Sequence, residues 1–190
     1  MNKIQNFGNF KVQYWIEEFP QLPKVATLTS HETLEVVASN NLVHTNKICV
    51  EMYLHKNASN YGLLGFEFRY KENSNNLDIE IHFTDGNTKE YQSEINKNDK
   101  TIYCGLIEEY VSYIKNRVVD KLQKKNGLFK GSIIVSCAAN SEVGSSSRIF
   151  GIISDIIIEL FFKIQEKKIP DLDECFKSAL YSCGLIRGEH

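Results

Sequence analysis

Six basic side chains near the middle of the chain could bind a phosphate backbone. Apolar residues recur at helical spacing between residues 106 and 122, which predicts an amphipathic helix that begins at Cys104. The face opposite the apolar stripe and the turn after the helix carry the basic residues Lys115, Arg117, Lys121, Lys124, Lys125 and Lys130. Lysine and arginine neutralise phosphate charges when proteins bind nucleic acid. The alternative interpretation is a solvated outer face, which many helices have.

A serine-rich loop offers a second kind of chemistry. Gly144, Ser145, Ser146 and Ser147 precede an apolar helix expected over residues 148–164. Backbone N–H groups and serine hydroxyls at a helix N-terminus can hold a phosphate, and the loop resembles the phosphate loop of the GHMP small-molecule kinases. Because serine is also a preferred N-cap residue, plain helix capping is the alternative interpretation.

Other reactive residue types show no catalytic or metal-binding pattern. The five cysteines are odd in number and contain no C-x-x-C pair, so we expect reduced thiols, with Cys137 in the core. No histidine falls at ligand spacing from a cysteine or carboxylate on one element. No nucleophile and base are arranged for catalysis. The sequence therefore predicts a non-enzymatic protein with no metal and no cofactor.

The composition is that of a folded domain. The 190 residues are 42% hydrophobic and 11% aromatic, and their formal net charge is −2. This charge argues against a protein that coats nucleic acid, although a local basic face remains compatible with it. The N-terminal residues lack the apolar segment of a secretory signal, and the apolar run 149–162 is too short to span a membrane. We expect a cytoplasmic protein with no membrane partner.

Alternating patterns predict strands in the first hundred residues. The extended segments are residues 10–16, 25–28, 33–38, 47–54, 65–70 and 77–83. Pro20 and Pro23 separate the first of them from the second. Asp85 and Gly86 predict a hairpin turn, with a return strand over residues 88–95. We therefore expect an antiparallel meander between residues 46 and 100.

The second half predicts a helix, a turn, a buried strand, a loop and a helix. Gly127 and Gly131 bracket the turn, and β-branched residues 133–135 predict the buried strand. The helix 148–164 is apolar nearly all round, which predicts the central core helix, with a single solvated strip of Asp155, Glu159 and Lys163. A last helix begins at Asp171 or Asp173 and ends at Gly184.

Three segments of residues 104–164 together resemble domain IV of the elongation factor G family of translational GTPases. Residues 105–114 (GLIEEYVSYI) are similar to the family's G-V-I-P-x-E-Y-I segment, with one residue and the proline missing. Residues 127–134 (GLFKGSII) are similar to its G-x-L-x-G-Y-x-V turn, and residues 143–150 (VGSSSRIF) to its V-D-S-S-E-x-A-F helix start. The resemblance implies a small α+β fold with two helices on one face of a four-stranded sheet. The chain has no P-loop, so no GTPase activity is expected.

These observations predict a single α+β domain over residues 1–190. It consists of a β-rich extension (1–45), a core resembling elongation factor domain IV (46–167) with a mixed or antiparallel sheet and two main helices on one face, and a C-terminal helix (168–190). We expect a non-enzymatic binding protein that recognises RNA or a ribosome-associated partner through the basic helix. The alternatives are a protein-interaction or self-assembling module, with a homo-oligomer possible, and an enzyme that binds a phosphorylated small molecule at Gly144–Ser147.

Overall fold

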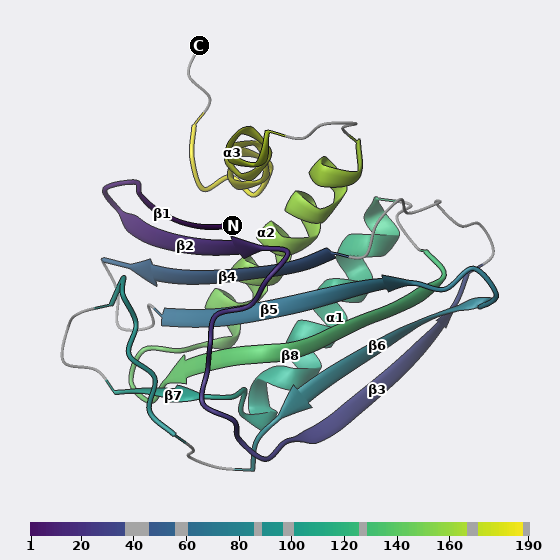
Figure 1. Ribbon diagram of the computed structural model, residues 1–190, viewed down its shortest axis with the longest axis horizontal. Helices are drawn as coiled ribbons and strands as arrows, with labels where there is room; N and C mark the ends of the chain where they lie inside the picture. Colours follow the sequence, from purple (N-terminus) through teal and green to yellow (C-terminus); the bar gives the residue numbers. More distant parts are fainter. Residues whose placement is uncertain are drawn as a thin grey trace.

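The computed structural model describes residues 1–36, 46–55, 61–85, 89–96, 101–125, 129–166 and 171–187. Within them the fold is α+β, with eight strands in one mixed sheet and three helices (Figure 1). The strand order is β1-β2-β4-β5-β8-β6-β3, with β7 also paired to β8. The elements are β1 (Asn2–Asn6), β2 (Phe10–Ile16), β3 (Leu28–Glu35), β4 (Asn46–Leu54), β5 (Tyr61–Tyr70), β6 (Asn76–Phe83), β7 (Ile102–Cys104), α1 (Glu108–Lys124), β8 (Gly131–Ser141), α2 (Ser147–Glu166) and α3 (Leu172–Ser182).

Strand β8 is the centre of the sheet. It pairs antiparallel with β5, parallel with β6, and antiparallel with β7 near its end. Ten of its eleven residues are buried, and Ser136 is the exposed exception. A strand buried on both faces has an apolar run instead of an alternating pattern, so the buried strand predicted around residues 133–135 is confirmed.

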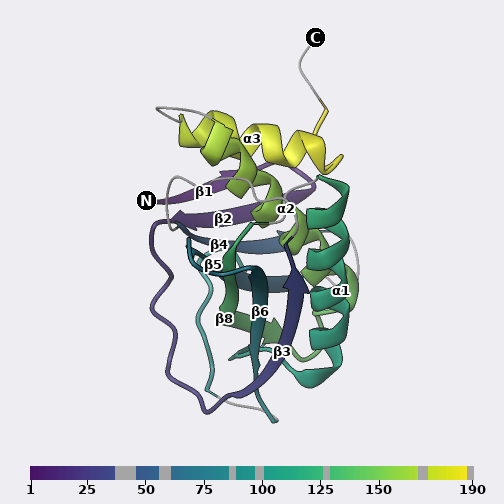
Figure 2. The ribbon, with the colours of Figure 1, turned by 90° about the vertical axis from the view of Figure 1, so that its right-hand side faces the viewer.

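Helices α1 and α2 cover one face of the sheet, and α3 packs against α2 beside β1 and β2 (Figures 1 and 2). The main core lies between this face and the helices. The aromatic pairs with the closest ring centres in the described chain are Phe68 with Phe161 and Tyr14 with Phe176, at 3.9 and 4.0 Å. Although α2 is buried on nearly all sides, none of the described helices is long and apolar enough to cross a membrane.

The connection between β6 and β8 determines which face the helices cover. The two strands are parallel neighbours, and α1 lies between them in sequence. Seen with these strands pointing away from the viewer, as in Figure 2, the path from β6 through α1 to β8 turns anticlockwise, so the crossover is left-handed. About 98% of such crossovers are right-handed. The opposite hand would place α1 on the other face, so this topology leaves that face free of α1.

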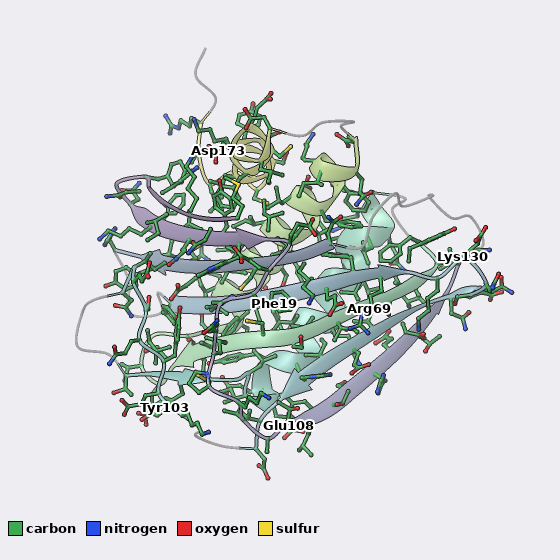
Figure 3. The ribbon with its side chains drawn as sticks, in the orientation of Figure 1. Phe19, Arg69, Tyr103, Glu108, Lys130 and Asp173 are labelled. Atoms are coloured by element: carbon green, nitrogen blue, oxygen red, sulfur yellow. The ribbon has the colours of Figure 1, made fainter. Side chains whose placement is uncertain are left out.

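Residues 17–27, called the strap below, cross this other face between β2 and β3 (Figure 1). Phe19 and Leu22 of the strap pack on a second, smaller apolar cluster of the sheet. Tyr91, from the segment that precedes β7, packs against the same cluster. Beyond the strap this face of the sheet is polar. There the Arg69 guanidinium lies 2.8 Å from the Glu67 carboxylate (Figure 3).

The neighbours of the N-terminal strands differ from the expected meander. β2 pairs with β4 at one side of the sheet, whereas β3 pairs with β6 at the opposite edge. Residues 25–27, expected to be extended with Leu28, belong to the strap instead. The predicted domain boundaries at 45 and 167 lie outside the described residues. Strands from residues 1–36 thus share one sheet with the expected core.

The meander predicted for residues 46–100 is only partly correct. β4 and β5 form the expected antiparallel pair, but β8 lies between β5 and β6. The predicted return strand 88–95 is wrong, because residues 89–95 contain only an isolated bridge from Glu90 to Tyr103. Both edges of β6 are already paired, with β3 and β8. Gly86 and residue 88 lie outside the described residues.

The three predicted helices form, but α1 begins later in the sequence than predicted. Residues 102–104 form β7, and Gly105 (φ 101°) changes the chain direction, so α1 begins at Glu108 and not at Cys104. The side chain of Asp171 accepts hydrogen bonds from the N–H groups of Asp173 and Glu174, which confirms the expected start of α3. Gly184 (φ 70°) follows the helix end. Gly127, one of the two expected turn glycines, lies outside the described residues.

Candidate functional site

The basic helix face is largely paired with carboxylates of the same chain. The guanidinium of Arg117 donates two hydrogen bonds to Asp155 of α2. Lys121 and Lys125 lie 2.8 and 2.7 Å from the two carboxylate oxygens of Glu159. Lys115 lies 3.1 Å from Glu32 of β3, so four of the six predicted basic residues have a carboxylate partner. These four charges are therefore partly neutralised within the protein.

The carboxylates of α2 are not the solvated strip that the sequence predicted. Asp155 and Glu159 are only 7% and 3% exposed, because they lie at the contact between α1 and α2. Burial favours the neutral form of Glu159, but the ammonium groups of Lys121 and Lys125 favour the charged form more strongly, so its pKa is lowered. A buried carboxylate requires such partners. Helical spacing identified the strip but not the helix that covers it.

Lys124 and Lys130 remain as possible contacts for an anionic partner. Lys124 is exposed at the end of α1, and Lys130 is half-buried just before β8 (Figure 3 labels Lys130). Neither forms an ion pair with another residue of the described chain. The predicted patch of six cations thus contains two without a carboxylate partner among the described residues.

The serine-rich loop is tied to the neighbouring strands. Ser145 Oγ accepts a hydrogen bond from the Ser141 N–H and donates one to the Tyr61 carbonyl, both at 2.7 Å. The Tyr61 N–H donates to the Gly144 carbonyl. Ser146 Oγ accepts from the Ile149 N–H, which agrees with the expected helix capping, and Ser147 is the first residue of α2. The hydroxyl groups of Ser145 and Ser146 therefore already have partners in β5, β8 and α2.

The cysteines and potential metal ligands are not grouped into a metal site. The five thiols form no disulfide, and Cys137 is buried as expected. Burial raises the pKa of Cys104, which keeps its thiol protonated near neutral pH. Among the described residues, no group of three His, Cys, Asp or Glu side chains could hold a metal ion.

A pocket of about 370 Å³ lies between the strap and the sheet. Its volume falls within the range of small-molecule sites, roughly 300–1,000 Å³. The strap contributes mainly apolar side chains, including Phe19, Leu22 and Val25. The sheet contributes His82 of β6, the turn after β7 and residues 136–138 of β8. We call this site the strap pocket. Four segments that are far apart in the sequence therefore build it.

The floor of the strap pocket is an irregularity in β8. The register with β5 shifts between Gly65 and Phe66, which face Cys137 and Val135. The ladder with β6 ends at Val135, and the ladder with β7 begins at Ala139. Ser136 therefore has no ladder partner on either side, unlike every other residue of β8. Such β-bulges redirect side chains and are frequent beside binding sites.

The strap is fixed at its beginning by a network of hydrogen bonds. Glu17 has a left-handed backbone (φ 69°), which is uncommon for a residue other than glycine. Its N–H donates to the Lys47 carbonyl, and its carboxylate accepts from the Asn46 side chain at 2.5 Å. Gln165 of α2 donates to the same Asn46 side chain at 2.6 Å. These contacts hold the turn that directs the strap across the sheet.

The polar groups around the strap pocket are few. His82 Nε2 lies 2.5 Å from a carboxylate oxygen of Glu80, two residues earlier on β6. Lys24 of the strap is exposed at the pocket wall. Ser136 lines the floor. A site of apolar walls with a few polar groups is the usual composition for binding a small molecule.

A buried glutamate lies on the same face, nearer to β2. Glu51 of β4 is fully buried and accepts a hydrogen bond from the Tyr61 hydroxyl at 2.7 Å. Burial raises its pKa more than hydrogen bonds from Ser93, Tyr61 and Tyr91 lower it. Tyr91 and Ser93 belong to the segment 89–96, so Glu51 helps to hold that segment on the sheet.

The strap pocket was not predicted from the sequence. Its lining residues carry no motif, and the only local signals were Pro20 and Pro23, which indicated an irregular segment after the first long strand. The sequence matches no protein-family model, and comparison with curated proteins and with solved structures gave no match.

Proposed function

We propose that the protein is a binding protein that holds a small molecule with an apolar body in the strap pocket. The observation that carries this proposal is the position of Ser136, which has no ladder partner and lies under a strap of apolar side chains. An interruption of the central strand leaves space and polar groups at the point where the strap covers the sheet. The proposal requires no catalytic group.

The surroundings of the pocket support binding to a preformed site. Phe19 is held against the sheet close to Gly65, with the Lys47 ammonium 5.7 Å from its ring centre. The network of Glu17, Asn46 and Gln165 fixes the start of the strap. A preformed site loses less conformational entropy when a ligand binds.

Fluorescence titration with N-phenyl-1-naphthylamine, a neutral apolar probe, tests the proposal. We expect saturable binding to the wild-type protein. Ser136→Trp places a bulky side chain at the exposed floor residue and should weaken binding at least about tenfold, a loss of about 1.4 kcal/mol. Ser112→Trp, at an exposed position of α1, is the matched control and should bind like the wild type.

Circular dichroism and thermal melting would show that both variants are folded. Absence of saturable binding to the wild type, or equal binding by folded Ser136→Trp and wild type, would overturn the proposal.

RNA or ribosome recognition is the second candidate function, and two observations favour it. Lys124 and Lys130 have no carboxylate partner within the described chain. The resemblance to elongation factor domain IV is compatible with β4, β5, β8 and β6 carrying α1 and α2 on one face. Four paired cations reduce this support, so we rank this function below ligand binding.

A further inference from the structure

The geometry points to an acid as the ligand of the strap pocket: a small molecule with an apolar body and a carboxylate or sulfonate group. This inference rests on the proposed function and adds the charge of the ligand. The residues that line the pocket include two basic side chains, Lys24 and His82, and no aspartate or glutamate. The lining therefore favours negative charge over positive charge.

The carboxylates nearest in the sequence to Lys24 and His82 all have partners, and none of them pairs with Lys24. Glu80 pairs with His82, Glu17 accepts a hydrogen bond from Asn46, and Glu18 pairs with the N-terminal ammonium at 2.9 Å. Lys24 forms no ion pair with another described residue. Because Glu80 lies beside His82, His82 adds no net positive charge, and Lys24 is the positive group that the pocket offers to an anion.

Ser136 gives the acid a second polar contact. Ser136 belongs to the floor, whereas Lys24 belongs to the strap that covers the pocket. A carboxylate or sulfonate only accepts hydrogen bonds, and the ammonium and the hydroxyl can both donate them. The apolar body of such a ligand fits the side chains of Phe19, Leu22 and Val25. A cationic ligand would instead face Lys24 with like charge.

Two probes that share one ring system test the charge of the ligand. 8-Anilinonaphthalene-1-sulfonate carries a sulfonate that N-phenyl-1-naphthylamine lacks. We expect the sulfonate probe to bind the wild-type protein about three- to fivefold more tightly, as one partly exposed ion pair contributes up to about 1 kcal/mol. Lys24→Gln should remove this advantage and leave binding of the neutral probe unchanged.

Lys71→Gln, an exposed lysine in the turn after β5, is the matched control and should preserve the difference between the probes. Equal affinity of both probes for the wild type, or an equal loss of both in Lys24→Gln, would overturn the inference while the neutral probe still demonstrates a binding pocket. Failure of the neutral probe to bind would overturn the proposed function itself. A sulfonate signal that survives in folded Ser136→Trp arises outside the pocket and would also contradict the inference.

Discussion

Phe19 lies so close to Gly65 that no side chain fits between the strap and β5. A methyl group added to Gly65 would lie 2.9 Å from the Phe19 ring and 2.8 Å from Cβ of Cys137. Both distances are too short for carbon atoms, so one of the neighbours would have to move. The glycine is therefore what allows the strap to lie flat on the sheet beside the pocket.

Gly65→Ala should destabilise the protein by about 1–3 kcal/mol, the usual cost of overpacking a well-filled site. Chemical denaturation measures this change. Phe19→Ala removes one of the two close contacts, so Gly65→Ala should cost less in that background, as a double-mutant cycle would show. Equal costs in both backgrounds would mean that Phe19 does not lie against Gly65.

Lys121 should contribute to stability, whereas its exposed neighbour Lys124 should not. Lys121→Met leaves the buried Glu159 with only Lys125 and should cost about 1–2 kcal/mol. Lys124→Met, the matched control, should change stability by less than about 0.5 kcal/mol. Urea denaturation at neutral pH compares the two variants. Similar effects of both substitutions would contradict the ion pairs between α1 and α2.

The same site has a consequence for acid stability. The pKa of Glu159 is lowered in the folded state, so its contribution to stability is present above the ordinary glutamate pKa and is lost as the pH falls through the lowered pKa. The difference between wild type and Lys121→Met should therefore shrink in acid. A difference that stays constant down to pH 2 would show that the charge of Glu159 is not involved.

Glu51 should give the opposite pH dependence. Its pKa is raised above 4.5 by burial, so the folded state binds this proton more tightly than the unfolded state. The associated stability is present below pH 4.5 and is lost as the pH rises through the raised pKa. Glutamine cannot ionise, so Glu51→Gln does not lose this stability. As the pH rises from 4 to 8, the stability of the variant should therefore increase relative to that of the wild type.

Urea denaturation across this pH range measures the effect. Glu67→Gln is a control of opposite sign, because the hydrogen bond with Arg69 lowers the pKa of Glu67. It should lose stability relative to wild type as the pH rises from acid to neutral. A pH-independent difference for Glu51→Gln would contradict the raised pKa.

Any RNA binding by the basic helix should depend only weakly on salt. If Lys124 and Lys130 are the available contacts, the logarithm of affinity for single-stranded RNA should fall with the logarithm of salt concentration with a slope of about −1.4. Six free cations would give a slope of about −4. Fluorescence anisotropy with labelled oligouridine measures it. A steep slope, or strong weakening by Lys121→Glu with little loss of stability, would show that the paired cations also bind RNA.

The sequence predicted secondary structure better than it predicted neighbours. Strict alternation placed Phe66 and Phe68 in the core and Glu67 and Arg69 on the other face, because side-chain direction depends only on local period. The turn signal at Asp85 suggested that the next segment pairs with β6. It could not show that β3 and β8 would occupy both edges of that strand.

The candidate site was less predictable for the same reason. Helical spacing placed Lys121 and Lys125 on one side of α1, but their partner Glu159 follows more than thirty residues later, and only the packing of α1 on α2 joins them. The strap pocket depends on a one-residue register shift at Ser136. Such a shift changes no composition or periodicity that can be recognised in a single sequence.

The N-terminal strands at opposite sides of the sheet have a consequence for the order of folding. β2 needs β4, β3 needs β6, and Lys3 of β1 pairs with Asp173 at the start of α3. During synthesis β1, β2 and β3 are therefore made before their partners β4 and β6, and α3 completes the contacts of β1. Pairings between distant parts of a chain form slowly. The sheet should therefore acquire its final structure only after α3 has been synthesised.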